Sequence, residues 1–407
     1  MEINSFDVII IGAGPAGSAC AIRLAGSGIK VALIDKARFP RDKVCGDALS
    51  IDVINQLKIL SPELAAKFYA SPQKTASYGI RLFAPSLESI GIPFIYNGEE
   101  SCGYISQRID FDNLLFEHAK SSGNIETFEN CEIEMMLIEK DGITAYAKNK
   151  IFKSKMIIGA DGAHSVVAKK LANFKVNKEH YTAGLRVYYE GVEGMQEGNY
   201  IELHFFNEVL PGYLWIFPLT GNRANVGIGI QSSVISKKKI NLKQTLEHLI
   251  TTQEHLKKRF QNARPLETVK GYGLPLGSRK ISVSGERFLL TGDAASMIDP
   301  LSGEGIGNAI RCGRIAAEHA ISCISQHNFS AAFNKSYDKV LYERMWKELR
   351  VSRIIQKLFS RAWLLNLIIH KANRSTYLKN LLTKALGNTS KKKSLLLNPG
   401  FYWKMIR

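Results

Sequence analysis

The 407-residue sequence lacks the features that define several classes of protein. It has six cysteines and no Cys-x-x-Cys pair, so neither a disulfide framework nor a metal site is predicted. Its best apolar run, residues 362–369, is too short to cross a bilayer and is flanked by Arg361 and Lys371. Only five mixed residues precede the first predicted strand, which leaves no room for a signal peptide. We therefore expect a protein of the reducing cytoplasm.

Negative charge is scarce in the C-terminal region. After residue 330 the sequence has 17 Lys or Arg against three acids, and this surplus makes up most of the net charge of +17. Residues 353–371 mix basic side chains with aliphatic and aromatic ones, a pattern typical of helices that lie on a membrane surface. A helix packed on the rest of the protein with a solvated basic face fits equally well. A nucleic-acid partner is not predicted, because no reading motif accompanies the charge. The oligomeric state is left open.

What the sequence does contain is a glycine-rich turn directly after an apolar strand. Residues 6–11 are mostly aliphatic, and Gly12, Gly14 and Gly17 follow around the start of a predicted helix over residues 18–25. In a dinucleotide fold these glycines permit the tight turn, the close approach of a pyrophosphate and close helix packing. The next predicted strand ends at Asp35, where a carboxylate accepts hydrogen bonds from ribose hydroxyls.

Two later segments repeat this arrangement of an apolar strand and a glycine-bearing loop. Residues 156–167 contain Gly-Ala-Asp161-Gly, and residues 287–310 contain Gly292-Asp293 and then a Gly-Glu-Gly-Ile stretch from Gly303. The helix that begins there would offer free N–H groups to an electron-rich ligand. Strand-rich stretches interrupt the three segments, which indicates excursions into a second domain.

Other local patterns predict further elements. Helical spacing of apolar residues predicts helices over 51–68 and 242–260, and Asp112 is placed to cap a helix over 113–121. Tyr213, Trp215 and Phe217 alternate along a strand and so share one face. This row is either core packing or the wall of an apolar pocket.

Taken together, the three segments resemble the FAD-dependent oxidoreductases of the p-hydroxybenzoate-hydroxylase type, and within them the geranylgeranyl reductase group. Members of that group carry a Cys-Gly loop after the second strand, matched here by residues 41–46. They also carry a Tyr-x-Trp-x-Phe-Pro signature, matched by residues 213–218. The loop departs from the family at Asp47, where the family usually has a second glycine.

The resemblance implies an α/β fold with an α+β substrate part. A Rossmann-like FAD-binding domain would be interleaved with a mixed-sheet substrate domain and followed by a helical tail. We assign residues 1–74, 105–178 and 271–330 to the FAD domain, 75–104 and 179–270 to the substrate domain, and 331–407 to the basic tail.

The resemblance also implies roles for single residues. Arg108 would lie beside the FAD phosphates or ribityl chain, Asp161 would support the pocket, and Asp293 would bind ribityl or ribose hydroxyls. The full set of implied cofactor-binding residues is Gly12, Gly14, Pro15, Ala16, Gly17, Asp35, Lys36, Arg41, Cys45, Gly46, Arg108, Asp161, Gly292, Asp293, Pro300, Gly303, Gly305 and Ile306.

The reaction implied is hydride transfer from reduced FAD to a C=C bond of a prenyl or similar lipid, with a proton added to the other carbon. Cys45 is the first candidate for supplying or positioning that proton, and its alternative is a small packing residue. Tyr213 and Trp215 would line the substrate tunnel, whereas His164 and His204 are predicted to be structural or surface residues. NAD(P)H is the expected transient electron donor.

Two other functions remain open. An FAD monooxygenase or halogenase acting on an aromatic substrate would use the same scaffold, although halogenases carry Trp-x-Trp-x-Ile-Pro where this sequence has residues 213–218. A flavoprotein that only binds membranes or partners is the third possibility.

Overall fold

The computed structural model describes residues 2–96, 98–195, 198–387, 390–397 and 400. A six-stranded sheet carries the N-terminal turn, with strand order β11-β3-β2-β15-β23-β22. Its neighbouring strands are parallel except for β22 and β23. The inner strands are buried aliphatic runs, as a parallel sheet covered on both faces requires. The strands are β2 (Val8–Ile11), β3 (Val31–Ile34), β11 (Ile125–Phe128), β15 (Met156–Gly159), β22 (Ser284–Gly285) and β23 (Phe288–Leu290).

Helices α1 (Pro15–Leu24) and α9 (Ile306–Ser325) pack closely against each other beside this sheet. A Cβ on Gly313 of α9 would lie 2.2 Å from the Ala16 carbonyl oxygen of α1, so only glycine permits this contact. The two glycine-bearing helix starts, 290 residues apart in sequence, are therefore held together by direct helix packing.

Two predicted helices differ from the observed ones. The helix expected over 51–68 is broken into α2 (Ile51–Leu60) and α3 (Pro62–Ala70), because Ser61 caps the second helix and a proline starts it. Helix α4 (Arg108–Lys120) begins before Asp112, so the prediction that Asp112 caps it is wrong. Asp112 lies inside the helix and is paired with Arg108 one turn earlier.

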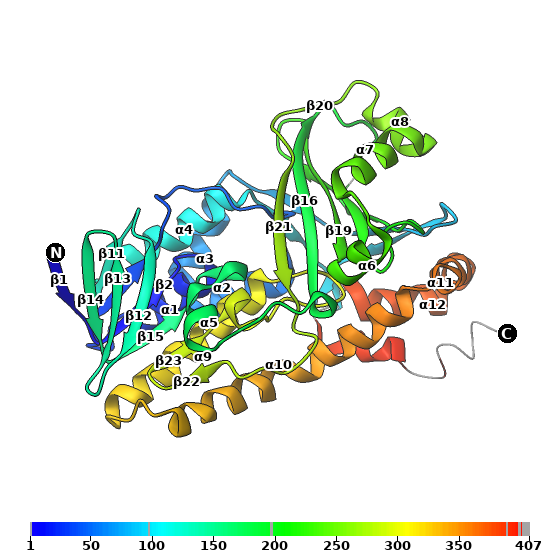
Figure 1. Cartoon of the computed structure of the whole chain (residues 1–407). Coiled ribbons are helices and arrows are strands. Elements are labelled where there is room, and N and C mark those ends of the chain that lie inside the picture. The colour runs from blue at the N-terminus through cyan, green and yellow to red at the C-terminus, as the bar shows by residue number, and fades with distance from the viewer. Residues whose placement is uncertain (1, 97, 196–197, 388–389, 398–399, 401–407) are drawn as a thin grey trace.

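A second, eight-stranded sheet stands beside the first (Figure 1). Its order is β20-β16-β19-β18-β17-β6-β7, and β21 also pairs with β16. Strands β6 and β7 come from the early excursion and the others from residues 181–275, so one sheet is built from two distant parts of the chain. The strands are β6 (Gly79–Phe83), β7 (Ser89–Pro93), β16 (Tyr181–Glu190), β17 (Ile201–His204), β18 (Tyr213–Leu219), β19 (Arg223–Gln231), β20 (Arg264–Pro265) and β21 (Lys270–Pro275).

Helices α6 to α8 cover one face of this sheet, and the C-terminal helices cover part of the other at β6 and β7. The helix predicted over 242–260 is broken at Gln253 into α7 (Leu242–Thr252) and α8 (Glu254–Phe260), and α6 (Ser232–Lys238) precedes them. Leu246 and Leu249 of α7 pack on the aliphatic residues of β18 and β19. Strand residues that point the other way face the FAD-domain side.

Smaller elements complete the two halves. A four-stranded sheet joins β1 (Glu2–Ser5), β14 (Lys150–Ser154), β13 (Ile143–Ala147) and β12 (Ile133–Ile138), and the sequence did not predict β1. The remaining short elements are β4 (Ala48–Leu49), β5 (Thr75–Ser77), β8 (Ile95–Tyr96), β9 (Glu99–Glu100), β10 (Gly103–Ile105), α5 (Val166–Leu171), η1 (Gly162–His164), η2 (Lys178–His180) and η3 (Gly292–Ala295).

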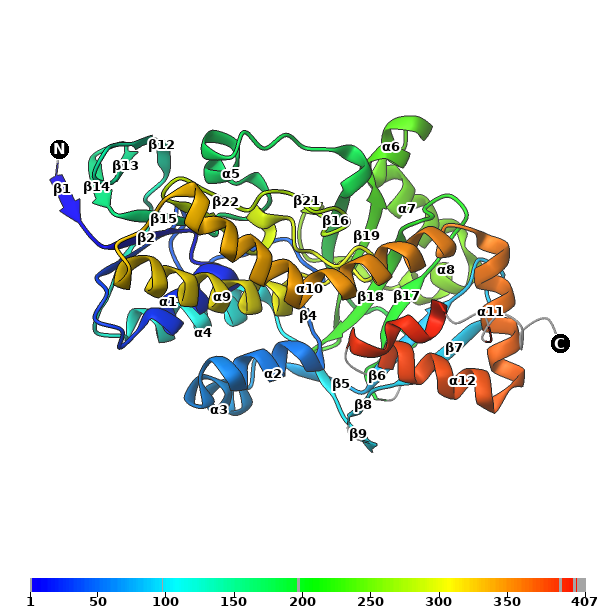
Figure 2. The same cartoon turned by 90° about the horizontal axis from the view of Figure 1, so that it is seen from below.

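The C-terminal region is helical, as predicted. Figure 2 shows α10 (Ala331–Phe359) running beneath both sheets toward α11 (Ala362–Arg374) and α12 (Thr376–Leu382), which precede η4 (Thr383–Gly387) and η5 (Ser390–Leu397). Leu364, Leu365 and Ile368 of α11 are buried in one apolar cluster with Ile90 and Ile92 of β7. Within the described ranges, none of the helices combines the length and apolar character needed to cross a membrane.

These observations confirm the predicted fold class, whereas the domain boundaries remain a prediction. Strand β21 pairs with the eight-stranded sheet, although its residues 271–275 fall in the segment assigned to the FAD domain. The predicted tail residues 401–407 lie outside the described residues.

Candidate active site

A cavity of about 880 Å³ is lined by residues of both large sheets and of the C-terminal region. This volume is within the range of cofactor and small-molecule sites. The predicted site residues line it, with the exception of Gly17 and Gly292, which are buried beside lining residues. The structure thus brings together segments that the sequence separates by several hundred residues.

The glycine turn forms one end of the cavity. Gly12 has φ +98°, and a Cβ on Gly17 would lie 1.8 Å from the Gly12 carbonyl oxygen, so both positions exclude side chains. Gly14, the N-cap residue of α1, forms no side-chain cap hydrogen bond, and its Cβ position is 3.4 Å from Arg41. A bare helix start beside an arginine fits the pyrophosphate of FAD.

Asp35 stands beside this turn, at the end of β3. Its Oδ2 accepts a hydrogen bond from the Ala13 backbone N–H at 2.8 Å, and its Oδ1 accepts one from the Ala37 N–H at 2.9 Å. Each carboxylate oxygen has a second lone pair that a ribose hydroxyl can use. Asp35 therefore fixes the turn and remains suitable for the predicted contact with ribose. Lys36, which follows it, also lines the cavity.

Arg108 is part of a buried ion-pair cluster on the cavity wall. Its Nε and Nη2 donate to the two Asp112 oxygens at 2.6 and 2.7 Å, and Arg41 Nη1 donates to Asp112 at 2.9 Å. Burial opposes the charge on Asp112, but the two arginines outweigh it and lower the pKa of this carboxyl. Cys45 lies near Arg108 on the cavity wall. The cluster holds two cations in fixed positions for an anionic ligand.

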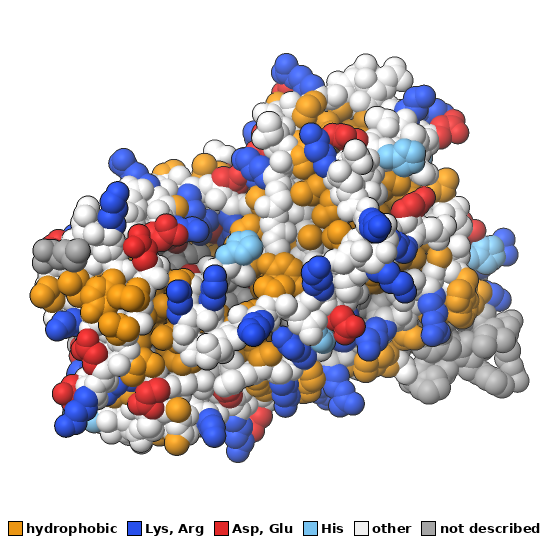
Figure 3. All heavy atoms as spheres, in the orientation of Figure 1, with side chains coloured by type: hydrophobic (Ala, Val, Ile, Leu, Met, Phe, Trp, Pro, Cys, Tyr) orange, Lys and Arg blue, Asp and Glu red, His pale blue; other side chains and the backbone are white. Residues whose placement is uncertain are grey.

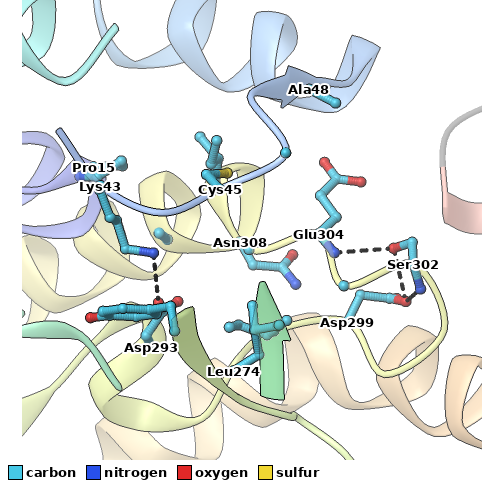
Figure 4. Close-up of a pocket in the computed structure, with 18 of the residues that line it drawn as sticks. Pro15, Lys43, Cys45, Ala48, Leu274, Asp293, Asp299, Ser302, Glu304 and Asn308 are labelled. Atoms are coloured by element: carbon cyan, nitrogen blue, oxygen red, sulfur yellow. Dashed lines mark hydrogen bonds and ion pairs between the residues drawn. The ribbon is translucent and has the colours of Figure 1, made fainter. Parts of the chain in front are cut away.

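The two later acids have different surroundings. Asp161 accepts hydrogen bonds from the Ser165 hydroxyl at 2.5 Å and the Val166 N–H at 2.6 Å, so it braces its own loop, and burial raises its pKa. Asp293 lies 3.7 Å from Lys43 Nζ, and Figure 4 shows this pair inside the cavity. A carboxylate beside a cation on the cavity wall can bind the hydroxyls of a ribityl chain.

The Cys-Gly loop packs directly on the aromatic row. A Cβ on Gly46 would lie 2.8 Å from the Phe217 ring, and Tyr213, Trp215 and Phe217 all line the cavity. The row is thus cavity wall, which was one of the two predicted alternatives. Gly303 lies beside this row, because its Cβ position is 3.3 Å from the Tyr213 hydroxyl, which donates a hydrogen bond to the Ser302 carbonyl.

Asp47, the departure from the family pattern, points away from the cavity. Its backbone has φ +66°, which explains why glycine is usual there. Its buried Oδ2 accepts hydrogen bonds from the Tyr188 hydroxyl at 2.7 Å and from Asn225 Nδ2 at 2.8 Å. Asn225 also donates to the Cys45 carbonyl and accepts from Trp215 Nε1. Asp47 therefore ties the loop to the aromatic strand.

The two histidines are placed as predicted. His164 is exposed at the cavity rim and contacts Tyr272 edge to face. His204 is fully buried on the opposite face of β17, where it bonds with Glu202 at 3.0 Å.

Several cavity residues were missed by sequence reasoning, namely Ser50, Asp52, Asp299, Glu304, Arg311 and Lys393. Glu304 lies within the quoted Gly-Glu-Gly-Ile stretch, so an acid between two glycines at a helix start was the signal that could have found it. Lys393 had no such signal, because its position depends on the packing of the C-terminal region.

Comparisons with known proteins agree with this geometry. The family described as FAD binding domain matches residues 5–313. The digeranylgeranylglycerophospholipid reductase of Methanosarcina mazei is 30% identical over 374 residues, covering 88% of this chain and 85% of the relative. The protein of the same name from Methanocaldococcus jannaschii is 31% identical, with 88% of each chain covered.

Solved structures show the same fold. A geranylgeranyl bacteriochlorophyll reductase-like protein from Thermoplasma acidophilum has a TM-score of 0.79 at 24% identity, covering 97% of this chain and 99% of the other. The halogenase PltM with phloroglucinol and FAD has a TM-score of 0.74 at 18% identity, covering 98% and 90%. The two sequence relatives described above are named as reductases, whereas the halogenase matches in fold alone.

The glycine turn, the three distant segments around one cavity and these relatives agree. The chain is an FAD-dependent oxidoreductase and belongs to the geranylgeranyl reductase family of FAD-binding proteins.

Proposed function

We propose that the protein reduces C=C bonds of a prenyl lipid, for which bound reduced FAD supplies the hydride. The observation that carries this proposal is the two-ended cavity. One end has the glycine turn and the paired arginines, and the other has apolar side chains from β6, β17 and the C-terminal helices, including Leu82, Leu203 and Phe359. An apolar arm of this kind suits an isoprenoid chain, which offers no polar groups for recognition. The relatives named digeranylgeranylglycerophospholipid reductase support the same substrate class.

Different residues of the cavity would bind the cofactor and the lipid. The turn from Gly12 to Gly17, with Arg41, would bind the pyrophosphate, and Asp35 the ribose. Lys43 and Asp293 would hold the polar chain that leads to the flavin ring. Tyr213 and Trp215 would form the wall along which the prenyl chain lies, and Cys45, whose carbonyl accepts a hydrogen bond from Asn225, would position it. Exclusion of water by this apolar wall would favour hydride delivery to an alkene.

We further propose that NAD(P)H reduces the flavin during a transient encounter. The sequence has no second G-x-G-x-x-G turn that would indicate a resident nicotinamide site. Flavin reduction by NADPH or NADH under anaerobic conditions, followed by absorbance, would identify the donor.

We also propose that the protein works at the cytoplasmic surface of a membrane. Trp363 is 60% exposed and Ile354 38% exposed, and they lie among the cations of α10 and α11. Figure 3 shows Lys and Arg side chains gathered along the lower edge, where α10 lies. Flotation with vesicles that contain anionic lipid tests this idea; failure to float at low salt would reject it.

Mass spectrometry tests the central proposal. Reduced holoenzyme is incubated with a digeranylgeranylglycerophospholipid dispersed in detergent, and each reduced bond adds the mass of two hydrogens. An unchanged lipid mass, with the flavin present and reduced, would reject the substrate class.

A further inference from the structure

Glu304 is a carboxyl of the cavity for which the proposed function gives no role. It lies just before α9, and Figure 4 shows its side chain extending toward the segment that contains Ala48. Its Oε1 accepts a hydrogen bond from the Ser50 hydroxyl. The accessible part of the side chain belongs to the cavity wall.

Two other carboxyls lie near Glu304, and each has its own cation. Arg311 Nη2 donates to both oxygens of Asp52 at 2.6 and 2.8 Å. Lys393 Nζ donates to Asp299 Oδ2 at 2.8 Å, and the Ser352 hydroxyl donates to the same oxygen at 2.6 Å. Within the described residues, no Lys, Arg or His lies within salt-bridge distance of Glu304.

Gly307 shows how close two of these carboxyls are. A Cβ on Gly307 would lie 2.8 Å from Asp52 Oδ2 and 3.3 Å from Glu304 Oε1, so both face the same small residue. Burial and then the Asp52 charge raise the pKa of Glu304 to about 7, against the opposing effects of Ser50 and Lys393. Burial opposes the charge on Asp299 too, but Lys393 and its hydrogen-bond donors lower its pKa. Compared with Asp299, Glu304 is therefore the acid that retains a proton near neutral pH.

Two other groups of the cavity are less suited to donate a proton. Asp161 accepts hydrogen bonds from the Ser165 hydroxyl and the Val166 N–H, so it is engaged within its own loop. The Tyr213 hydroxyl already donates to a carbonyl, and burial raises its pKa. A general acid is most effective when its pKa is near the working pH.

On the basis of the proposed function, we propose that Glu304 is the catalytic proton donor of the reduction. The π bond breaks, one carbon gains the hydride from reduced flavin, and the other gains the Glu304 proton as the O–H bond breaks. The flavin is left oxidised and Glu304 is left as a carboxylate, which the Ser50 hydroxyl stabilises until a proton from solvent restores the acid. Cys45 on this account positions the lipid and supplies no proton.

Single-turnover kinetics test this assignment. Dithionite-reduced, flavin-loaded enzyme is mixed anaerobically with the detergent-dispersed lipid, and flavin reoxidation is followed by absorbance. In the wild type we expect the rate to fall as pH rises through about 7, because the acid form is lost. Glu304→Gln should reoxidise about 10²–10⁴-fold more slowly and without that pH dependence. Glu318→Gln, a charge change on the outer side of α9 where Glu318 pairs with Arg23, is the matched control.

Two further measurements separate catalysis from structure. Asp52→Asn removes the charge that raises the pKa of Glu304, so the descending limb of the pH profile should move to lower pH. Infrared difference spectra of the protein between pH 5 and 9 should contain the C=O band of a protonated carboxylic acid that titrates near pH 7. Glu304→Gln should lack this band and keep the band of Asp47, which titrates near pH 6. This spectral readout requires no substrate.

The outcomes distinguish the two proposals. Wild-type reoxidation with an unimpaired Glu304→Gln rate, or an Asp52→Asn profile that does not move, would overturn the proton-donor role alone. A wild-type flavin that the lipid never reoxidises would overturn the substrate class and the donor role together. Flavin absorbance of each variant verifies that the site is intact.

Discussion

The two ends of the cavity are built in different ways. At the turn between β2 and α1, backbone atoms and missing side chains create the site, so a single added methyl group is excluded at Gly17. At the other end, side chains from four separate segments meet around Glu304, and their charges set its protonation. A steric change at the glycine turn should therefore cause loss of the cofactor. A chemical change near Glu304 should lower the reaction rate while the cofactor stays bound.

The largest effect is expected from Gly17→Ala. The new Cβ would lie 1.8 Å from the Gly12 carbonyl oxygen, so the turn must shift, at a cost of about 3 kcal/mol or more in the free energy of unfolding. We expect protein without flavin and with a lowered Tm, measured by absorbance and calorimetry. Gly123→Ala, where a Cβ meets no atom within 4 Å, is the control. Full flavin content in the Gly17→Ala protein would contradict the prediction that a steric change at the glycine turn causes loss of the cofactor.

Trp215→Leu should affect the second end alone. Losing part of the aromatic wall removes about 1.5 kcal/mol of apolar contact, which corresponds to an increase of about tenfold in KM for the lipid. Flavin content should be unchanged. Trp346→Leu on α10, outside the cavity, serves as the comparison. A Trp215→Leu protein that lost its flavin would place the ring beside the cofactor and away from the lipid.

Cys45→Ser should have a smaller effect. A hydroxyl is similar to the thiol in shape, so we expect normal flavin content and a turnover lowered by less than about tenfold, or about 1.4 kcal/mol in barrier. A loss comparable to that expected of Glu304→Gln would return Cys45 to the role of proton donor. Unchanged turnover would leave it as a packing residue.

The smallest effect concerns Asp47 and the dependence of stability on pH. Burial raises the pKa of Asp47 from 3.8 to about 6, despite hydrogen bonds from Tyr188 and Asn225. Between these values the unfolded chain releases the proton and the folded chain keeps it, so the stability contribution of Asp47 falls as pH rises. Asp47→Asn should lack this fall, and Tm measured from pH 4 to 7 for both proteins tests it. Parallel Tm curves would show that Asp47 is ionised throughout.

The same contrast between the two ends of the cavity explains which parts of the molecule could be predicted from the sequence. The roles of Gly12, Gly14 and Gly17 could be predicted, because a site built from backbone atoms requires glycines at fixed spacing in the sequence. Asp112 was misread as a cap, although Arg108 stands one helical turn earlier in the sequence. Its second partner, Arg41, reaches it only through tertiary packing. The Ser61-Pro62 boundary was visible in the sequence and was overlooked.

The charged residues around Glu304 form no comparable pattern in the sequence. Glu304 depends on residues at positions 50, 52, 299 and 393, and no local rule relates such distant positions. Periodicity placed Tyr213, Trp215 and Phe217 on one face but left open what that face contacts. The structure resolves this by placing Gly46 against Phe217.

The pairing of β6 with β17 has a consequence for how the protein is made and how it can be altered. These strands are parallel neighbours, yet β17 follows only after the α4 helix and strands β11 and β15 of the other sheet. Such long-range pairing slows folding, because the early strand has no partner until much of the chain is available. It also means that neither half is a continuous segment. A transplant of the apolar part of the cavity into another flavoprotein would have to include both the segment with β6 and the segment with β17.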